Sequence, residues 1–273
     1  MINYHLSNFL TINGIGSASG IVFLDNKLYL IGDNSGFLYV YNINSQKLEK
    51  YPLIENAITN IAKKDKPDFE SITLRNNKLY VFGSGSTKKR EIKVKFDLKT
   101  HEVKTKDLTN LYDKLKLKAN FTNDDLNIEG SFFYNNRLYF LNRGNGLLNN
   151  NGVFIYDKEN ENIDYKPYQL PKINNFESSF TDGIVFENKM YFLATAENTT
   201  STYLDGEIYG SLIGIIDLKT RKLEGFLKIS DNQKFEGLTF YSKNINEINF
   251  LVCEDNDTEV LVSNIYKLTI DIS

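Results

Sequence analysis

Short apolar runs rich in β-branched and aromatic residues alternate with tight polar turns along the whole chain. Between residues 21 and 53, four such runs (21–24, 28–31, 37–41 and 48–53) follow one another with turns or loops between them. This spacing is typical of antiparallel strands joined as hairpins. The turn Asp25-Asn26-Lys27 recurs at 76–78, 135–137 and 187–189, and asparagine tolerates the positive φ of such corners. The pattern therefore predicts an all-β fold made of one repeated unit.

One short phrase opens each unit: an oxygen-bearing residue, a small residue and then a strand. The small residue stands at positions 20, 71, 130, 183 and 237, so consecutive copies are 51, 59, 53 and 54 residues apart. This period is close to that of β-propeller blades, which span about 40–50 residues. The phrases are Ser19-Gly20-Ile21-Val22-Phe23, Glu70-Ser71-Ile72-Thr73-Leu74, Glu129-Gly130-Ser131-Phe132-Phe133, Asp182-Gly183-Ile184-Val185-Phe186 and Glu236-Gly237-Leu238-Thr239-Phe240.

The two ends of the chain complement each other. The last repeat has room for only three strands, whereas a strand-like segment from Ile2 to Ile12 precedes the first repeat without a partner. If the N-terminal strand completes the last blade, the ring closes and no sheet edge is left exposed. We therefore predict a single five-bladed β-propeller over residues 1–273, with two short helices between blades at residues 54–62 and 108–117.

The amino-acid composition excludes several kinds of metal site and gives no support for several kinds of partner. The net charge of −3 gives no reason to expect a nucleic-acid or membrane partner. Two histidines and one cysteine cannot form a multi-histidine zinc site or an internal disulfide. The N-terminus lacks a secretory signal pattern, so we expect a cytoplasmic protein, or a secreted one whose signal has been removed. We also expect a monomer. Any chemistry should then be that of carboxylates and other oxygen groups.

The residue before each innermost strand should lie at equal depth around the central axis. Four of these five residues are acidic, and buried, unpaired carboxylates are costly unless protons, basic groups or a cation compensate them. Oxygen ligands in a large, irregular site suit Ca²⁺. Alternatively, the carboxylates accept backbone N–H bonds and join the blades without a metal. The predicted ring, and the predicted Ca²⁺ ligands, are Ser19, Glu70, Glu129, Asp182 and Glu236.

The loop after the second strand of each blade should lie on the same face as this ring, because the first two strands are antiparallel. These loops are rich in functional groups, and a cleft above the ring is the default binding site. The residues expected to bind a small anionic ligand or substrate are Lys88, Arg90, Arg143, Asn145 and Asn34. Two carboxylates in the same loops, Glu197 and Glu254, are candidates for a general base.

The phrase Asp68-Phe69-Glu70-Ser71 resembles the Asp-x-Glu-Gly phrase of phytase-like bacterial propellers. The five-blade plan with a ring of Glu and Ser is similar to the calcium-dependent nucleotidase (apyrase) family, and the chain also resembles uncharacterised bacterial propellers. The nucleotidase resemblance implies that the predicted ring holds Ca²⁺ beneath a nucleotide phosphate.

Three functions remain open at this stage. The first is Ca²⁺-dependent hydrolysis of an anionic ester, above all a phosphoester. The second is a non-catalytic platform that binds a ligand or a protein and uses the cation as a structural element. The third is a lactonase-like hydrolase of a carboxyl ester.

Overall fold

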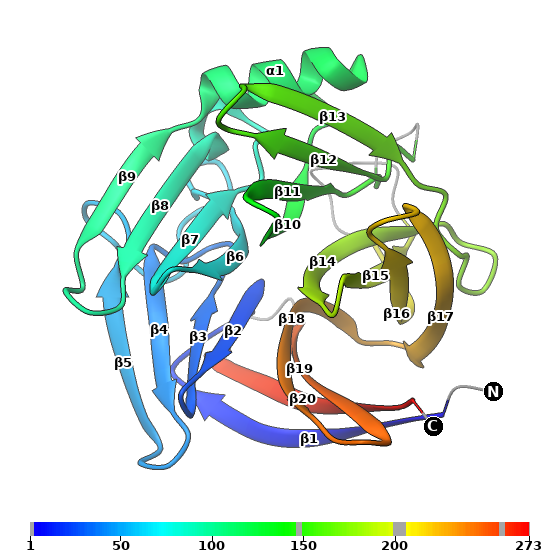
Figure 1. Cartoon of the computed structure of the whole chain (residues 1–273). Coiled ribbons are helices and arrows are strands. Elements are labelled where there is room, and N and C mark those ends of the chain that lie inside the picture. Colours follow the sequence, from blue (N-terminus) through cyan, green and yellow to red (C-terminus); the bar gives the residue numbers. More distant parts are fainter. Residues whose placement is uncertain (1–2, 146–148, 199–205, 257–259, 273) are drawn as a thin grey trace.

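The computed structural model describes residues 3–145, 149–198, 206–256 and 260–272. Within them, five four-stranded antiparallel sheets surround a central axis (Figure 1). Blade one consists of β2 (Gly20–Leu24), β3 (Lys27–Ile31), β4 (Phe37–Asn42) and β5 (Lys47–Pro52). Blade two consists of β6 (Phe69–Arg75), β7 (Lys78–Gly83), β8 (Ile92–Asp97) and β9 (Val103–Asp107). Blade three consists of β10 (Ile128–Tyr134), β11 (Arg137–Asn142), β12 (Gly152–Asp157) and β13 (Asn162–Pro167). Blade four consists of β14 (Ser178–Phe186), β15 (Lys189–Glu197), β16 (Ile208–Asp217) and β17 (Lys222–Ser230).

The last blade joins the two ends of the chain. It contains β18 (Lys234–Lys243), β19 (Glu247–Asp255) and β20 (Val262–Asp271), with β1 (Tyr4–Asn13) as its outer strand. The pairing of β1 with β20 is antiparallel and runs from Tyr4 opposite Ile270 to Asn13 opposite Val262. The prediction of five blades closed by the N-terminal strand is confirmed.

The tight turns between the first two strands of blades one to four follow the sequence pattern. At the turn between β2 and β3, Asp25 and Asn26 have φ of 50° and 58°. Asn76 and Asn77, which occupy the corresponding turn of blade two, have φ of 51° and 57°. Positive φ at both central residues is the requirement of the type I′ hairpin turn, whose twist matches that of the strands.

The hydrophobic core is divided among the five contacts between neighbouring blades. Each of the five clusters of buried apolar residues draws its members from two adjacent blades. Between blades two and three, for example, the rings of Phe82 and Phe140 meet edge to face with centroids 5.0 Å apart. Because every blade contributes to two clusters, the ring is packed without interruption and holds the inner strands at a common depth.

One of the two predicted helices is present. Helix α1 (Thr109–Ala119) follows β9 and confirms the prediction over residues 108–117. The prediction of a helix over residues 54–62 is wrong, because this segment consists of turns and bends. Asn56 and Asn60 adopt positive φ there, and Ile61 donates its backbone N–H to the carbonyl of Asn34. A short 3₁₀ turn, η1 (Lys88–Arg90), is the other helical element among the described residues.

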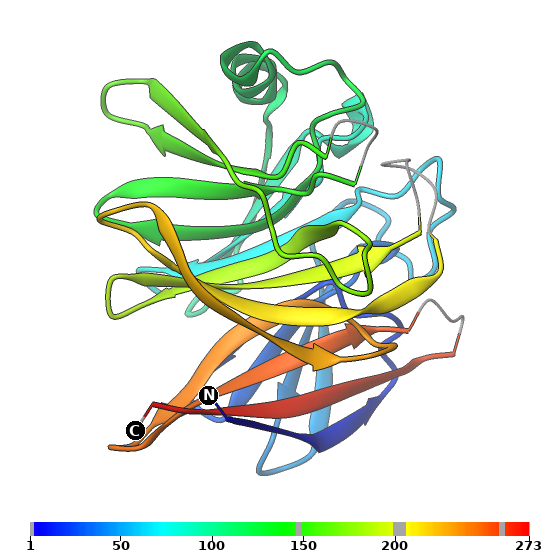
Figure 2. The same cartoon turned by 90° about the vertical axis from the view of Figure 1, so that its right-hand side faces the viewer.

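The second strands of the blades end on one face of the ring, and the start of β1 and the end of β20 lie on the opposite face (Figure 2). We call the loop-bearing end of the central channel the mouth. In the described part of the chain, no helix has the length and apolarity needed to cross a membrane.

Candidate functional site

A β-bulge at the start of the inner strand aims one side chain of each of four blades into the channel. The register of β6 with β7 moves from Phe69 opposite Gly83 to Ser71 opposite Phe82, so Glu70 has no partner across the sheet. The same shift occurs around Glu129 in β10 and around Glu236 in β18. A bulge of this kind redirects a side chain out of the regular alternation of the strand. The same type of β-bulge therefore directs three of the predicted ring residues into the channel.

In blade four the bulge places Thr181, rather than Asp182, in the ring. The register shift lies between Phe180 and Asp182. The Thr181 hydroxyl donates to the carbonyl of Phe235 in blade five at 2.6 Å. The Ser19 hydroxyl makes the equivalent bond, at 2.5 Å, to the carbonyl of Phe69 in blade two. The ring is therefore formed by Ser19, Glu70, Glu129, Thr181 and Glu236.

Asp182 joins two blades instead of pointing into the channel. Its two carboxylate oxygens accept the backbone N–H groups of Gly183 and of Leu238 in blade five, each at 2.7 Å. Burial raises the pKa of Asp182 well above its ordinary value, and these two hydrogen bonds oppose the shift. Asp182 therefore joins two blades by accepting backbone N–H bonds, as in the alternative that the sequence left open. The fourth repeat was aligned one residue too far along the chain.

A second tier of polar residues lies two positions before each ring residue. Asn127 donates to Glu129 at 2.7 Å, and the ammonium of Lys234 lies 2.9 Å from Glu236. The residue between the two tiers is always apolar and buried, as Phe69 and Phe235 are. The five residues of this second tier, all less than a tenth exposed, are Ser17, Asp68, Asn127, Ser179 and Lys234.

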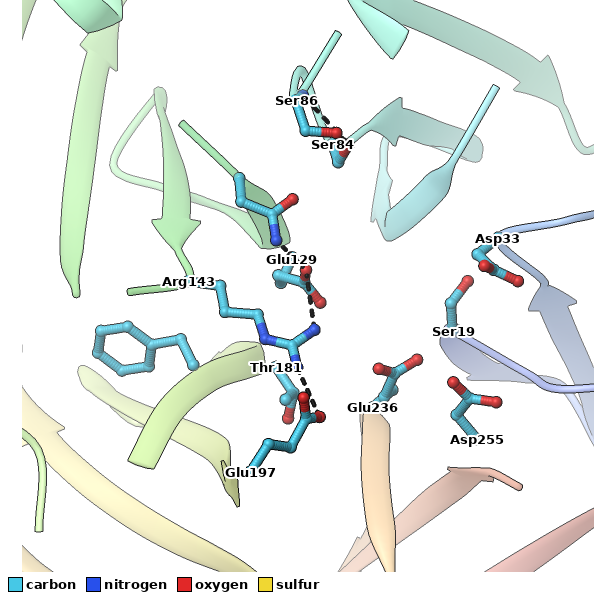
Figure 3. A network of polar contacts seen from close by, with 12 residues as sticks. Ser19, Asp33, Ser84, Ser86, Glu129, Arg143, Thr181, Glu197, Glu236 and Asp255 are labelled. Carbon is cyan, nitrogen blue, oxygen red and sulfur yellow. Dashed lines mark hydrogen bonds and ion pairs between the residues drawn. The ribbon is translucent and has the colours of Figure 1, made fainter. Parts of the chain in front are cut away.

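Two buried cations, Arg143 and Lys234, connect blades three, four and five at the mouth; Figure 3 shows Arg143 between Glu129 and Glu197. The guanidinium of Arg143 lies 3.3 Å from Glu129 and 2.6 Å from Glu197. The ammonium of Lys234 lies 2.9 Å from Glu236, 3.2 Å from Asp255 and 3.7 Å from Glu197. Burial alone would lower the pKa of Lys234, but the charges of Glu236 and Asp255 raise it well above its ordinary value. Both cations are thus held in place by carboxylates.

On the other side of the channel, Asp33, Asp68 and Glu70 form an acidic cluster. One carboxylate oxygen from each lies within 4.8 Å of the other two. The ammonium of Lys66 contacts Asp33 and lies 2.8 Å from Asp68. Arg90 lies 2.8 Å from the other oxygen of Asp68. In contrast, none of the described residues donates a hydrogen bond to the carboxylate of Glu70 or forms an ion pair with it.

Negative charge exceeds positive charge at the mouth. Among the described residues, seven carboxylates stand against four cations, an excess of three negative charges. Burial, followed by the charge of Glu129, raises the pKa of Glu70 well above its ordinary value. Burial likewise raises the pKa of Glu236, against the opposing charge of Lys234. The carboxylates are Asp33, Asp68, Glu70, Glu129, Glu197, Glu236 and Asp255, and the cations are Lys66, Arg90, Arg143 and Lys234.

Three of the other predicted site residues lie together beside the channel, and Asn34 lies in a different loop. Arg143, Asn145 and Glu197 line a pocket of about 260 Å³ beside the channel. Within the described chain, Arg143 Nε and Glu197 Oε2 are buried and have no hydrogen-bond partner. Asn34 lies in the loop between β3 and β4, where its carbonyl accepts a backbone N–H from residue 61.

Lys88 and Glu254 are not brought to the channel. The side chain of Lys88 is 63% exposed and lies 3.1 Å from Glu91 and 3.4 Å from Asp113, which belongs to α1. Glu254 accepts a hydrogen bond from the Tyr266 hydroxyl at 2.8 Å. Because successive side chains of a strand point to opposite faces, it is the next residue, Asp255, that faces the channel.

The fold and the site together define a five-bladed β-propeller with a buried, acidic, ion-paired channel mouth. The chain belongs to a family of unknown function, DUF6929, whose profile matches residues 14–270. This agrees with the resemblance to uncharacterised propellers, while a specific relation to phytase-like or nucleotidase propellers is not shown. No curated protein is similar enough to the chain to count as a match.

Several solved structures share the fold at low sequence identity. The glutaminyl cyclase of Myxococcus xanthus is 10% identical, with a TM-score of 0.57 over 100% of this chain and 99% of that one. A luciferin-regenerating enzyme is 11% identical, with a TM-score of 0.53 over 97% and 95%. A protein of unknown function from Bacteroides thetaiotaomicron is 12% identical, with a TM-score of 0.51 over 92% and 58%. At such identities these likenesses show the propeller fold alone.

Proposed function

We propose that this protein is a Ca²⁺-binding propeller whose cation site lies at the channel mouth beside Asp33, Asp68 and Glu70. The observation that carries the proposal is the state of Glu70. Glu70 is only 8% exposed, and its carboxylate lies near those of Glu129 and Asp68. No described residue donates a hydrogen bond to this carboxylate. An ionised carboxylate in such a position is costly unless a cation compensates it.

The donor set fits a hard cation. The three side chains offer oxygen ligands only, which are the ligands that Ca²⁺ prefers. Lys66, Arg90, Arg143 and Lys234 neutralise four of the seven carboxylates at the mouth when all are ionised, which leaves an excess of three negative charges. Lys66 already contacts Asp33 and Asp68, so Glu70 is the ligand whose removal should affect cation binding most.

We expect Ca²⁺ to raise the melting temperature of the metal-free protein by several degrees, because an ion that binds only the folded state stabilises it by mass action. At a Ca²⁺ concentration of about 100 times Kd, the gain is about 2.7 kcal/mol. Glu70→Gln should abolish this gain. The matched control is Asp182→Asn, which should lower stability by roughly 1–3 kcal/mol through the lost backbone contacts but leave the gain from Ca²⁺ intact. A melting curve that Ca²⁺ does not change would refute the site.

The melting temperature of the metal-free protein should also depend on pH. The pKa of Glu70 is raised in the folded state above its ordinary value of 4.5, so its contribution to stability is present at low pH and is lost as pH rises through the folded-state pKa. Without Ca²⁺, the protein should therefore melt at a higher temperature near pH 5 than near pH 8. With saturating Ca²⁺ the difference should shrink, since the ion compensates the ionised carboxylates.

The pocket beside Arg143 and Glu197 favours a catalytic role as the second part of the proposal: hydrolysis of a small anionic ester, such as a phosphoester. A bound Ca²⁺ supplies a Lewis acid that polarises a phosphoryl or acyl oxygen. In the chain itself, Arg143 Nε offers a buried donor to an anionic oxygen, and Glu197 Oε2 offers a buried acceptor for a proton. Arg143 is otherwise neutralised by Glu129 and Glu197, so net attraction for an anion depends on the cation.

A screen of phosphoesters, nucleotides, lactones and aryl esters in Ca²⁺ tests this second part. We expect Glu197→Gln to lower kcat/KM for the best substrate by about 100-fold or more, within the range for loss of a general base. Glu254→Gln, in a carboxylate bonded to Tyr266, should leave kcat/KM within about twofold. If lactones or aryl esters turn over but phosphoesters do not, the lactonase alternative is correct. Ca²⁺ binding without turnover of any of them would favour a non-catalytic binding platform.

A further inference from the structure

A separate groove runs between blades two and three, outside the channel mouth. It has a volume of about 380 Å³ and lies between β7 and β8 on one side and β11 and β12 on the other. Helix α1 follows β9 and lies along the outer rim beside β13 (Figure 1). Its residues Asn110, Leu111 and Lys114 line one end of the groove. The other end reaches Arg75 and Asn136, which belong to or adjoin the hairpin turns opposite the mouth. None of the residues predicted from the sequence to form a site lines this groove.

The groove is positively charged in a protein that is acidic as a whole. Its lining contains five cations and two carboxylates. One carboxylate, Glu161, lies 2.9 Å from Lys114, and the other, Asp107, accepts the backbone N–H of Thr109 at the start of α1. The other four cations form no ion pair with a carboxylate of the described chain, although the protein carries 35 acidic against 32 basic residues. These four are Arg75, Lys93, Lys106 and Lys158.

Two of these lysines stand directly opposite each other in the sheet. Lys93 of β8 pairs with Lys106 of β9. Like charges at directly opposed positions destabilise a sheet, so the arrangement costs stability in the absence of an anion. Burial, and then the charges of Lys106 and Lys158, lower the pKa of Lys93. The position of Lys93 is therefore one where a bound anion would relieve repulsion.

Aromatic rings lie beneath these cations. Tyr80 and Phe133 meet edge to face across the two blades, with ring centroids 5.2 Å apart. The guanidinium of Arg75 lies 4.7 Å from the centre of the Phe133 ring, and the ammonium of Lys93 lies 5.9 Å from the centre of the Tyr80 ring. The groove thus combines an apolar floor with a cationic rim.

We propose that this groove binds a small amphiphilic anion, with an aromatic or short alkyl body on Tyr80 and Phe133 and a carboxylate, sulfonate or phosphate group between Lys93 and Lys106. Charge complementarity selects the head group, and the volume of the groove limits the body to about the size of one or two rings. This site is independent of the cation site at the mouth.

The test uses 1-naphthalenesulfonate as the probe and isothermal titration calorimetry on the full chain. We expect it to bind at least tenfold more tightly than the uncharged analogue 1-naphthalenemethanol, and more weakly as salt is added. The double variant Lys93→Gln with Lys106→Gln should weaken sulfonate binding at least tenfold, which corresponds to about 1.4 kcal/mol. It should fold at least as well as the parent chain, because the substitutions remove a repulsive pair.

The chain offers a matched control in the same two strands. Lys95 and Lys104 form the neighbouring opposed pair, and neither lines the groove. The double variant Lys95→Gln with Lys104→Gln changes the net charge equally but should leave binding within twofold. Equal weakening by both double variants, equal binding of the charged and uncharged probes, or no binding at all would each overturn the proposal. Tighter binding of a glutamate-rich peptide than of the sulfonate by more than tenfold would also overturn it, in favour of a protein partner.

Discussion

Removal of residues 1–13 is expected to prevent the protein from reaching its native fold. Strand β1 supplies the outer edge of the last blade, where it pairs with β20 along nearly its whole length. Without it, β20 presents an open edge that can pair with other chains. Ile12, 1% exposed in the core between blades five and one, is lost as well, and removal of one such side chain costs about 2–5 kcal/mol. A domain with a total stability of about 5–15 kcal/mol does not tolerate both losses.

Circular dichroism and size-exclusion chromatography would measure this effect. The truncated chain should be aggregated, or should lack a cooperative melting transition. Removal of residues 1–2 alone, which leaves all of β1, is the control and should have little effect. A synthetic peptide of residues 4–13 should restore part of the transition by adding the missing strand in trans. A truncated chain that melts within a few degrees of the full chain would show that β1 does not hold the ring closed.

The Lys234→Met substitution should give the second-largest effect, a loss of about 3–5 kcal/mol in the free energy of unfolding. Lys234 is 4% exposed and lies within 4 Å of Glu197, Glu236 and Asp255. Methionine fills a similar volume but leaves three buried carboxylates without this cation. For a chain of this size, the loss corresponds to roughly 5–9 °C in melting temperature.

The matched control is Lys228→Met. Lys228 also pairs with a carboxylate, but its partner Asp231 is 90% exposed, and surface pairs of this kind contribute about 0–1 kcal/mol. The cost of Lys234→Met should be smaller at pH 5 than at pH 8, because Glu236, whose pKa is already raised, becomes neutral at low pH. The addition of Glu236→Gln should recover part of the loss and would show the coupling directly. If Lys234→Met costs no more than Lys228→Met, the buried network does not stabilise the fold.

Five blades, their boundaries and the closure by β1 could be predicted because each follows from local signals that repeat. The Asn-rich turns, the alternation along each strand and the spacing of the opening phrase are all properties of contiguous residues. The prediction of a helix over residues 54–62 was wrong because contacts with residues distant in the sequence determine the conformation of this segment. Backbone contacts with the loop between β3 and β4, 20 or more residues away, determine its course through the bonds at Ile58 and Ile61.

The candidate site was only partly accessible from the sequence. Glu70, Glu129 and Glu236 were found because they share one position in the repeat. The polar second tier was not predicted. A polar residue stands two positions before four of the five predicted ring residues, but in the fourth repeat Phe180 precedes Asp182, and only the correction to Thr181 completes the tier with Ser179. Lys66 stands at no repeated position, and nothing in its local sequence marks it as a channel residue. Asp255 lies in a loop that the sequence places on the ring face, but its neighbour Glu254 was chosen as the candidate, because the sequence does not show which of the two side chains faces the channel.

The sequence by itself determined the architecture, because strand alternation, turn type and repeat length are set by neighbouring residues. Only the tertiary structure decided which residue of blade four enters the ring. A β-bulge shifts the register by one residue, so Thr181 enters the ring and Asp182 turns to the backbone of blade five. It also decided that Arg90 and Arg143 are held by carboxylates. Ion pairing of this kind depends on distances between blades, which are set by packing around the whole ring rather than by any local pattern.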